Sequence, residues 1–276
     1  MKFIFFTTVF LIGGATIGFC QAPSIDATKE VENGASFIQG QPVAPGSFVA
    51  IFGNNFGSGL TLFDTVPLST QLAGASVTFN GIPAPVIGVA AGQINAEMPW
   101  GVLPAGAQTG TAQVIVTTAA GASAPVTIPV TSAAPGVFYI ATDSTGVNRP
   151  GAYNNSDGSL PLPPSVVFPG YTSRPSKPGE ILIVFATGLG PVTNPPPDGS
   201  PGLAQSPFST TMGTPTVLVG GVAANVLFSG LSPQYPSFYQ IAITIPANAP
   251  IGNAVSLQIQ MNGITTTDQL KIAISN

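Results

Sequence analysis

The sequence contains no histidine and one cysteine, Cys20, and charged residues make up only 6% of its 276 residues. Without histidine, the side chain that most often moves protons near neutral pH is missing, which excludes catalytic triads and histidine-based metal sites. Basic residues are few, with six Lys and Arg against ten Asp and Glu, so the chain offers no basic patch for nucleic acid. Carboxylates, hydroxyls and aromatic rings are the groups left to carry a function.

Charge is also absent from one long stretch of the chain. No charged residue occurs between Asp198 and Asp268. The surface of this part must therefore be kept soluble by Ser, Thr, Asn and Gln. Such a surface suits neutral polar partners or close packing.

Glycine, proline and apolar residues are abundant. The chain has 33 Gly and 29 Pro, yet 44% of its residues are hydrophobic, which is too apolar for a disordered linker. Short β-branched or aromatic runs alternate with Gly, Pro and Asn, and sustained helical periodicity is absent, so the chain is predicted to be all-β. The predicted strands form two sets: Ser47–Phe52, Ala75–Phe79, Ala84–Ala90, Gln93–Pro99, Ala112–Thr118 and Ala124–Val130, then Glu180–Ala186, Pro215–Val219, Ala224–Ser229, Phe238–Pro246, Val255–Met261 and Thr266–Ile274.

The N-terminus has the pattern of a secretory signal peptide. Lys2 is followed by an uncharged apolar run to Phe19, and Gly18 stands three residues before a cut after Cys20. An uncleaved anchor and a lipoprotein linked at Cys20 are the alternatives. Cleavage predicts a secreted mature chain without cysteine, with five basic and ten acidic residues and a net charge of −5, and with no membrane span. We expect it outside the cell or on the cell surface, with the periplasm as the alternative.

The two sets of strands follow the same order, which indicates an internal duplication. Pro45–Phe52 aligns with Pro178–Phe185, Val77–Ala84 with Val217–Ala224, and Gln93–Ile94 with Gln240–Ile241. The offset grows by seven residues at each step, as loop insertions would produce. Each copy has the size and strand number of an immunoglobulin-like sandwich. Asn80-Gly81 and Gly220-Gly221 lie between apolar runs and predict tight hairpins whose residues take positive φ.

This organisation predicts two tandem immunoglobulin-like β-sandwiches after the signal peptide. The leader is interpreted as a tether or a first edge strand. The segment between the sandwiches is predicted to open as a hairpin, from Ala134–Phe138 to Ser156–Gly158, and to continue as an extended, Pro-rich connector. The predicted boundaries are 1–20 for the signal peptide, 21–39 for the leader, 40–132 for the first sandwich, 133–176 for the connector and 177–276 for the second sandwich.

Several motifs of the second copy resemble a known family. They are Thr187-Gly188-Leu189-Gly190-Pro191, Asp198-Gly199, Val219-Gly220-Gly221-Val222-Ala223-Ala224 and Tyr239-Gln240-Ile241 before Pro246. Together they resemble the C-terminal domain family of secreted acidobacterial proteins first noted in Solibacter. The first copy is similar to the domain that commonly precedes it, through Ala44-Pro45-Gly46-Ser47, Phe52-Gly53, Asn80-Gly81-Ile82-Pro83-Ala84-Pro85 and Gly92-Gln93-Ile94-Asn95-Ala96. Both copies look like the IPT/TIG branch of immunoglobulin folds. The resemblance implies fold and export, and it implies no activity, catalytic residue or cofactor.

Enzyme chemistry finds little support in the remaining residues. A glycosidase needs two carboxylates roughly 5–10 Å apart across one bond, and Asp143 with Asp157, or Glu97 with Asp64, are the only pairs worth considering. Gly188-Leu189-Gly190 is followed by Pro191 rather than a helix, which does not suit phosphate binding. Asn154–Gly158 resembles a calcium loop but lacks its ligand spacing, so an ordinary turn is predicted. We predict no catalytic residue, no cofactor and no metal.

Aromatic residues are the remaining candidates for ligand contact. Trp100, just beyond Pro99, and Tyr235 and Tyr239 lie in or beside loops, where sugar-binding sandwiches present rings. The alternative is that these rings pack within a core or between the sandwiches. We therefore predict a secreted, non-enzymatic protein that acts in adhesion or assembly at the cell surface. Its partner would be a protein or a neutral polysaccharide of the envelope, and the alternative function is an extracellular polysaccharide-binding module.

Overall fold

The computed structural model describes residues 21–144, 146–266 and 270–276. The predicted signal peptide, residues 1–20, lies outside the described residues. Strands dominate, every ladder between them is antiparallel, and a single 3-10 turn, η1 (Trp100–Val102), interrupts them in the described ranges. The predicted all-β fold class is confirmed. Within the described part of the chain, no helix has the length and apolarity needed to cross a bilayer.

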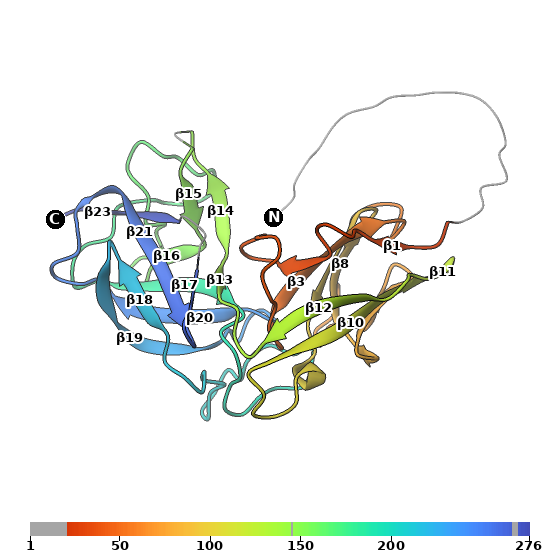
Figure 1. Ribbon diagram of the computed structural model, residues 1–276. Helices are drawn as coiled ribbons and strands as arrows, with labels where there is room; N and C mark the ends of the chain where they lie inside the picture. Colours follow the sequence, from red (N-terminus) through yellow and green to blue (C-terminus); the bar gives the residue numbers. More distant parts are fainter. Residues whose placement is uncertain (1–20, 145, 267–269) are drawn as a thin grey trace, which may run out of the picture.

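Residues 24–131, the N-terminal unit, form two sheets that pack face to face (Figure 1). One sheet has the order β1 (Ser24–Ile25), β3 (Phe48–Asn54), β9 (Gln93–Glu97), β8 (Val86–Ala90) and β4 (Thr61–Leu62), and β2 (Val31–Asn33) also pairs with β3. The other has the order β11 (Gly121–Ala122), β10 (Thr109–Thr118), β6 (Ala75–Phe79) and β5 (Gln71–Leu72), with β12 (Val126–Thr131) on β10 and β7 (Ile82–Pro83) on β6. Alternate residues of β6 are buried, and Val77 and Phe79 join Val49 and Ile94 in one core.

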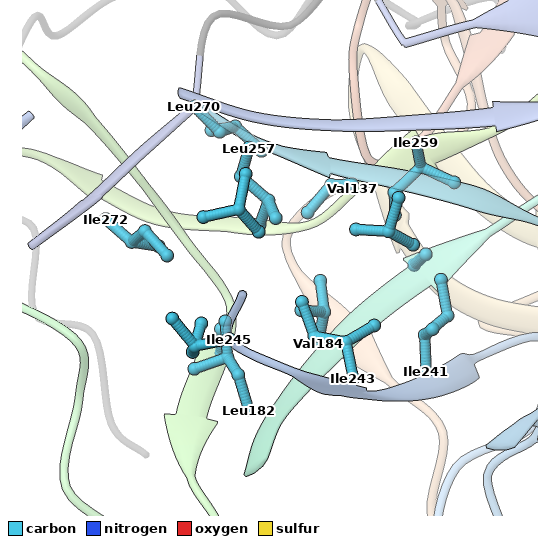
Figure 2. Packing of buried hydrophobic residues seen from close by; sticks show 14 of the residues in the cluster. Val137, Leu182, Val184, Ile241, Ile243, Ile245, Leu257, Ile259, Leu270 and Ile272 are labelled. Carbon is cyan, nitrogen blue, oxygen red and sulfur yellow. The ribbon is translucent and has the colours of Figure 1, made fainter. Parts of the chain in front are cut away.

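Residues 136–274, the C-terminal unit, form a nine-stranded sheet that folds over on itself. Its order is β13 (Gly136–Val137), β17 (Ile181–Thr187), β20 (Tyr239–Thr244), β19 (Val222–Leu231), β18 (Thr216–Val219), β21 (Gly252–Met261) and β22 (Ile264–Thr265), with β16 (Ala152–Asn154) on β17 and β23 (Lys271–Ile274) on β21. Strand β19 pairs with β18 at one end and with β20 at the other, and the register shifts between Val226 and Phe228. Figure 2 shows the resulting layers: Val184 and Ile243 point toward Leu257 and Ile259 across the core.

Equivalent positions of the two units carry the repeated sequences. Strand β3 pairs with β9 as β17 pairs with β20, and β6 pairs with β7 as β18 pairs with β19. Both short hairpins turn through two residues with positive φ: 52° and 78° at Asn80 and Gly81, and 60° and 84° at Gly220 and Gly221. The hairpin predictions are confirmed, because Asn and Gly tolerate this backbone region.

The leader and the connector are part of the sheets. In the leader, β1 and β2 both pair with β3. This pairing agrees with the interpretation of the leader as an edge strand rather than a tether. In residues 133–176, β13 and β16 pair with β17, so this segment is not the extended spacer that its prolines suggested. Its hairpin is formed by β14 (Tyr139–Thr142) and β15 (Asn148–Pro150), which end before the predicted closing turn. The turn at Ser156–Gly158 is therefore separate from this hairpin. In it, the Asp157 carboxylate accepts hydrogen bonds from the Ser159 N–H and hydroxyl.

Candidate binding site

A junction between the two units brings together residues far apart in the sequence. The Phe48 N–H donates to the Thr187 hydroxyl oxygen at 2.8 Å, and that hydroxyl donates to the Ser237 carbonyl at 2.8 Å. Beside this chain of bonds, the rings of Phe138 and Phe238 stack with centroids 4.0 Å apart and 7° between their planes. The ring of Phe48 meets both edge-on, at 5.7 and 6.0 Å. The junction is therefore tightly packed and hydrogen-bonded.

Glu97 is the buried carboxylate of this junction, with 2% of its surface exposed. It lies at the end of β9, and its two oxygens accept hydrogen bonds of 2.8 Å from the Gly199 N–H and the Ser237 hydroxyl, both in the C-terminal unit. Burial raises the pKa of Glu97 to about 7; the two hydrogen bonds oppose this rise, and the nearby Asp198 carboxylate adds to it. Glu97 therefore holds the two units together.

Trp100 also belongs to the junction. Its backbone N–H donates to an oxygen of Asp198 at 3.0 Å, and its ring packs against the C-terminal core. The ring lies so close to Gly46 that a side chain there would collide with it. The exposed part of Trp100 lines a small cavity of about 150 Å³ together with Leu103 and Pro191. Packing between the units thus accounts for the position of most of the Trp100 side chain.

The two predicted tyrosines have opposite environments. Tyr239 is fully buried, with 0% of its surface exposed, and its hydroxyl donates to the Gly190 carbonyl at 2.6 Å. Burial in the core leaves no ring face for a ligand, and it also raises the pKa of Tyr239. Tyr235 is 48% exposed, with its ring 5.5 Å from that of Phe238. Neither tyrosine borders the cavity that Trp100 lines, so the structure does not gather the three residues into one pocket.

Most of the other carboxylates named from the sequence have structural partners. Asp143 forms a buried ion pair with Arg149 at 2.7 Å, and that guanidinium also donates to the Asn253 and Lys271 carbonyls. Asp64 lies exposed on the segment between β4 and β5. Across residues 21–144, 146–266 and 270–276, no group of three or more His, Cys, Asp or Glu residues could hold a metal ion.

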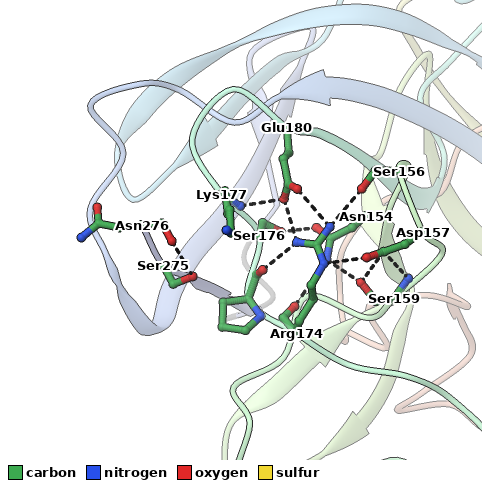
Figure 3. A network of polar contacts seen from close by, with 11 residues as sticks. Asn154, Ser156, Asp157, Ser159, Arg174, Ser176, Lys177, Glu180, Ser275 and Asn276 are labelled. Carbon is green, nitrogen blue, oxygen red and sulfur yellow. Dashed lines mark hydrogen bonds and ion pairs between the residues drawn. The ribbon is translucent and has the colours of Figure 1, made fainter.

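Arg174 is the centre of a polar network on the surface of the C-terminal unit (Figure 3). Its guanidinium contacts Asp157 at 2.7 Å, Glu180 at 2.8 Å and the Ser156 hydroxyl at 2.9 Å. The Ser159 hydroxyl and the Arg174 guanidinium lower the pKa of Asp157 to about 2. The loop that resembled a calcium site is therefore a turn fixed by an arginine.

Next to this network lies an aromatic pocket, lined by Tyr139, Ile140, Gly151, Ala152, Tyr153, Gly158, Leu160, Phe168, Tyr171 and Phe185, with a volume of about 410 Å³. Tyr153 on β16 and Phe185 on β17 form one ring pair, with centroids 5.9 Å apart. Phe168 and Tyr171, on the following loop, form a second pair at 5.8 Å. Tyr139 on β14 completes the lining and is 49% exposed. Half of the lining residues are aromatic, which is typical of ligand sites.

Sequence reasoning did not find this pocket. Its rings are spread over residues 139–185, and most of them lie in the segment interpreted as a connector. A local concentration of aromatic residues in that segment was the only available signal. The pocket exists because β16 pairs with β17, which brings Tyr153 beside Phe185, and this pairing was not predicted.

Comparisons with known proteins identify no relative that defines a function. No family model matches the chain, and no curated protein matches it. Solved structures to which the chain shows some similarity include the Bacteroides ovatus mixed-linkage glucan utilization locus protein SGBP-B in complex with a mixed-linkage heptasaccharide, at 14% identity and a TM-score of 0.31. The match covers 84% of this chain and 42% of that one, so this chain spans less than half of its length.

Two further structures show likeness of the same low order. The D00-D0 domain of intimin matches at 11% identity and a TM-score of 0.20, over 89% of this chain and 99% of that one. The I9-I11 tandem of titin matches at 10% identity and a TM-score of 0.21, over 92% of this chain and 67% of that one. Overlap at this level does not transfer a ligand or a partner to this chain.

Proposed function

We propose that this chain is a secreted, non-enzymatic binding protein that acts in adhesion or assembly at the cell surface. The observation that carries the proposal is the open aromatic pocket of the C-terminal unit, a cavity of about 410 Å³ with five rings and no charged residue in its lining. Pockets of this size and lining are typical of binding sites. The proposal keeps the family resemblance as a prediction, since export is what that resemblance implies.

The environments of the carboxylates support binding rather than catalysis. Glu97 is enclosed between the units, Asp143 is paired with Arg149, and Asp157 is paired with Arg174. An acid or base catalyst needs access to a substrate proton, within about 3 Å or through one water. Glu97 and the Asp143 side chain are buried and lack that access, and Asp157 is held in its turn by Arg174.

A second candidate function is an extracellular polysaccharide-binding module. Exposed rings favour it, because aromatic faces stack on the apolar faces of sugar rings. Tyr139 and Tyr171 are 49% and 53% exposed in the pocket, and Tyr235 is 48% exposed outside it. Trp100 and Tyr235 remain proposed contacts from the sequence, and alanine at either position would then weaken retention on an insoluble glycan.

Retention of the mature chain, residues 21–276, on isolated envelope and on insoluble polysaccharides tests the proposed function. Saturable binding to envelope that is lost after protease treatment would support assembly with a protein partner. Saturable binding to one polysaccharide would support the second candidate. The absence of saturable binding to every envelope fraction and every polysaccharide would contradict both.

A further inference from the structure

The aromatic pocket is built so that its ligand must be uncharged. Its ten lining residues are apolar or aromatic, and only the tyrosines contribute hydroxyl groups. Moving an unpaired charge from water into such a lining is costly. The charged residues nearest to the lining along the chain are already paired: Asp157 binds Arg174, and Asp143 binds Arg149. The neutral lining therefore matches a neutral ligand.

The rings of the pocket suit a flat ligand with apolar faces. The Tyr153–Phe185 pair and the Phe168–Tyr171 pair come from different segments of the chain. The two rings of the first pair are inclined at 40° to each other, and the two rings of the second pair at 64°. Tyr139 and Tyr171 are each about half exposed and offer accessible ring faces. A pyranose ring has one such apolar face, and its hydroxyls project from the edge toward polar groups.

A polar network adjoins one of the residues that line the pocket. Gly158 lines the pocket and directly follows Ser156 and Asp157, which are held by Arg174 (Figure 3). The side chains of Asp157 and Arg174 are 45% and 29% exposed, so both remain accessible to hydroxyl groups from solvent. Such polar side chains favour a ligand that carries hydroxyl groups over an apolar peptide side chain or a lipid tail.

A second cavity adjoins the pocket at Phe168. It has a volume of about 250 Å³ and shares Phe168 with the first cavity. Its lining adds the hydroxyl-bearing residues Thr142, Ser144 and Ser165, together with Asp143 and Arg149, whose charges are paired with each other. Successive residues of β14 line the two cavities in turn, first Tyr139 and Ile140, then Ala141 and Thr142. The two cavities suit a chain of linked units.

We infer that the pocket between β14, β16 and the Phe168–Tyr171 loop binds a neutral polysaccharide, with pyranose rings stacked on Tyr139 and Tyr171. This inference rests on the proposed function and gives its second candidate a ligand class and a site. It places the main contacts in the segment 139–185 rather than at Trp100 or Tyr235.

Calorimetric titration of residues 21–276 with soluble six-unit oligosaccharides of glucose, mannose and xylose tests the inference. A charged hexamer of galacturonic acid serves as the control ligand. We expect one neutral oligosaccharide to bind saturably and the charged one not to bind. A stacked ring contributes about a tenfold change in affinity. Tyr139→Ala and Tyr171→Ala should therefore each weaken binding about tenfold, and Tyr139→Phe should keep most of it.

Phe208→Ala is the matched control, because Phe208 is about as exposed as Tyr139, at 46% against 49%, but lies outside the pocket. It should leave the affinity within about twofold, as the ring makes no contact with the bound sugar. Equal losses in the Phe208 and Tyr139 variants would overturn the inference. Each variant's melting temperature, compared with that of the unaltered chain, distinguishes loss of contact from loss of fold.

Two further outcomes separate the inference from the proposed function. Binding to envelope that persists in Tyr139→Ala and Tyr171→Ala, with no oligosaccharide bound, would overturn the inference and leave a protein-binding function standing. Saturable binding of a neutral apolar dye, N-phenyl-1-naphthylamine, without any oligosaccharide binding would also overturn it. Absence of binding to envelope, oligosaccharides and dye would overturn the proposed function as well.

Discussion

At the scale of single residues, burial decides how each carboxylate behaves. Glu97 has only uncharged hydrogen-bond donors, the Gly199 N–H and the Ser237 hydroxyl, whereas Asp143 has the Arg149 guanidinium. A buried carboxylate without a cation favours its protonated form. A buried ion pair instead depends on both partners being present. The two residues therefore lead to different predictions.

Glu97→Gln should remove a pH dependence of stability. In the folded chain the pKa of Glu97 is about 7, against an ordinary value of 4.5, so between these values the folded state holds a proton that the unfolded state has released. The contribution of Glu97 to the free energy of unfolding is thus fully present below pH 4.5 and is lost as the pH rises through 7. The loss is about 3 kcal/mol at most. Urea unfolding between pH 5 and about 8 measures it.

The control for that experiment is Asp64→Asn, at an exposed carboxylate. It should preserve the fall in the free energy of unfolding with rising pH that the Glu97→Gln variant lacks. An unchanged pH slope in the Glu97→Gln variant would show that this carboxyl is already ionised in the folded chain.

Arg149→Leu should destabilise the fold far more than Arg174→Leu. Removing Arg149 leaves the Asp143 carboxylate buried without its cation, which costs about 3–5 kcal/mol. The Arg174 network is partly exposed, and solvent screens ion pairs of that kind, so its loss should cost much less. Denaturant unfolding at neutral pH measures both values. Similar losses in the two variants would contradict the difference in burial.

At the scale of strands and turns, the sequence predicts what depends on local patterns. Alternating apolar residues located β6 at Ala75–Phe79, and the paired Asn80-Gly81 located its hairpin. Both signals are local, because the side-chain period of a strand and the φ of a turn depend on near neighbours. The role of residues 133–176 was not predictable in this way. The prolines of that segment suggested an extended spacer, whereas pairing of β13 and β16 with the distant β17 makes it part of a sheet.

The two equivalent hairpins should respond differently to alanine. At Gly81 an added side chain meets nothing within 4 Å, so Gly81→Ala should cost only the backbone strain of its positive φ, about 1–2 kcal/mol. At Gly220 the same change adds a collision with Pro250, and Gly220→Ala should therefore cost more. Thermal unfolding of both variants gives the comparison. A Gly220 variant as stable as the Gly81 variant would show that Pro250 moves aside freely.

At the scale of the whole molecule, the junction joins two cores that share no buried residue in the described part of the chain. The hydroxyl of Thr187 links Phe48 of one unit to Ser237 of the other, and Glu97 adds two more bonds. Buried polar bonds of this kind are costly to leave unmade. The two units should consequently unfold together.

Residues 21–276 should show one unfolding transition. Fluorescence of Trp100, which lies at the junction, and far-ultraviolet circular dichroism should report the same midpoint. Thr187→Val removes the linking hydroxyl and should lower the free energy of unfolding by about 1–3 kcal/mol, whereas Thr187→Ser should retain most of it. Two separate transitions in the unaltered chain would contradict coupling of the units.

The candidate site is a whole-molecule property, and this limits how much of it the sequence predicts. The sequence predicted aromatic residues as the groups for binding, and exposed rings are found at Tyr235 and at Tyr139. It did not predict which rings meet, because Tyr153 and Phe185 come together only through long-range strand pairing. Tyr239 was chosen for its place beside a loop, yet the alternation of β20 turns it into the core.

Binding without turnover is tested by a single experiment that follows both at once. Residues 21–276 are incubated with the neutral polysaccharide that retains them best, and the bound fraction and the reducing ends released are measured in the same samples over a day. We expect saturable retention and no increase in reducing ends above a sample without protein. A steady release of reducing ends that scales with protein concentration would contradict a non-enzymatic role.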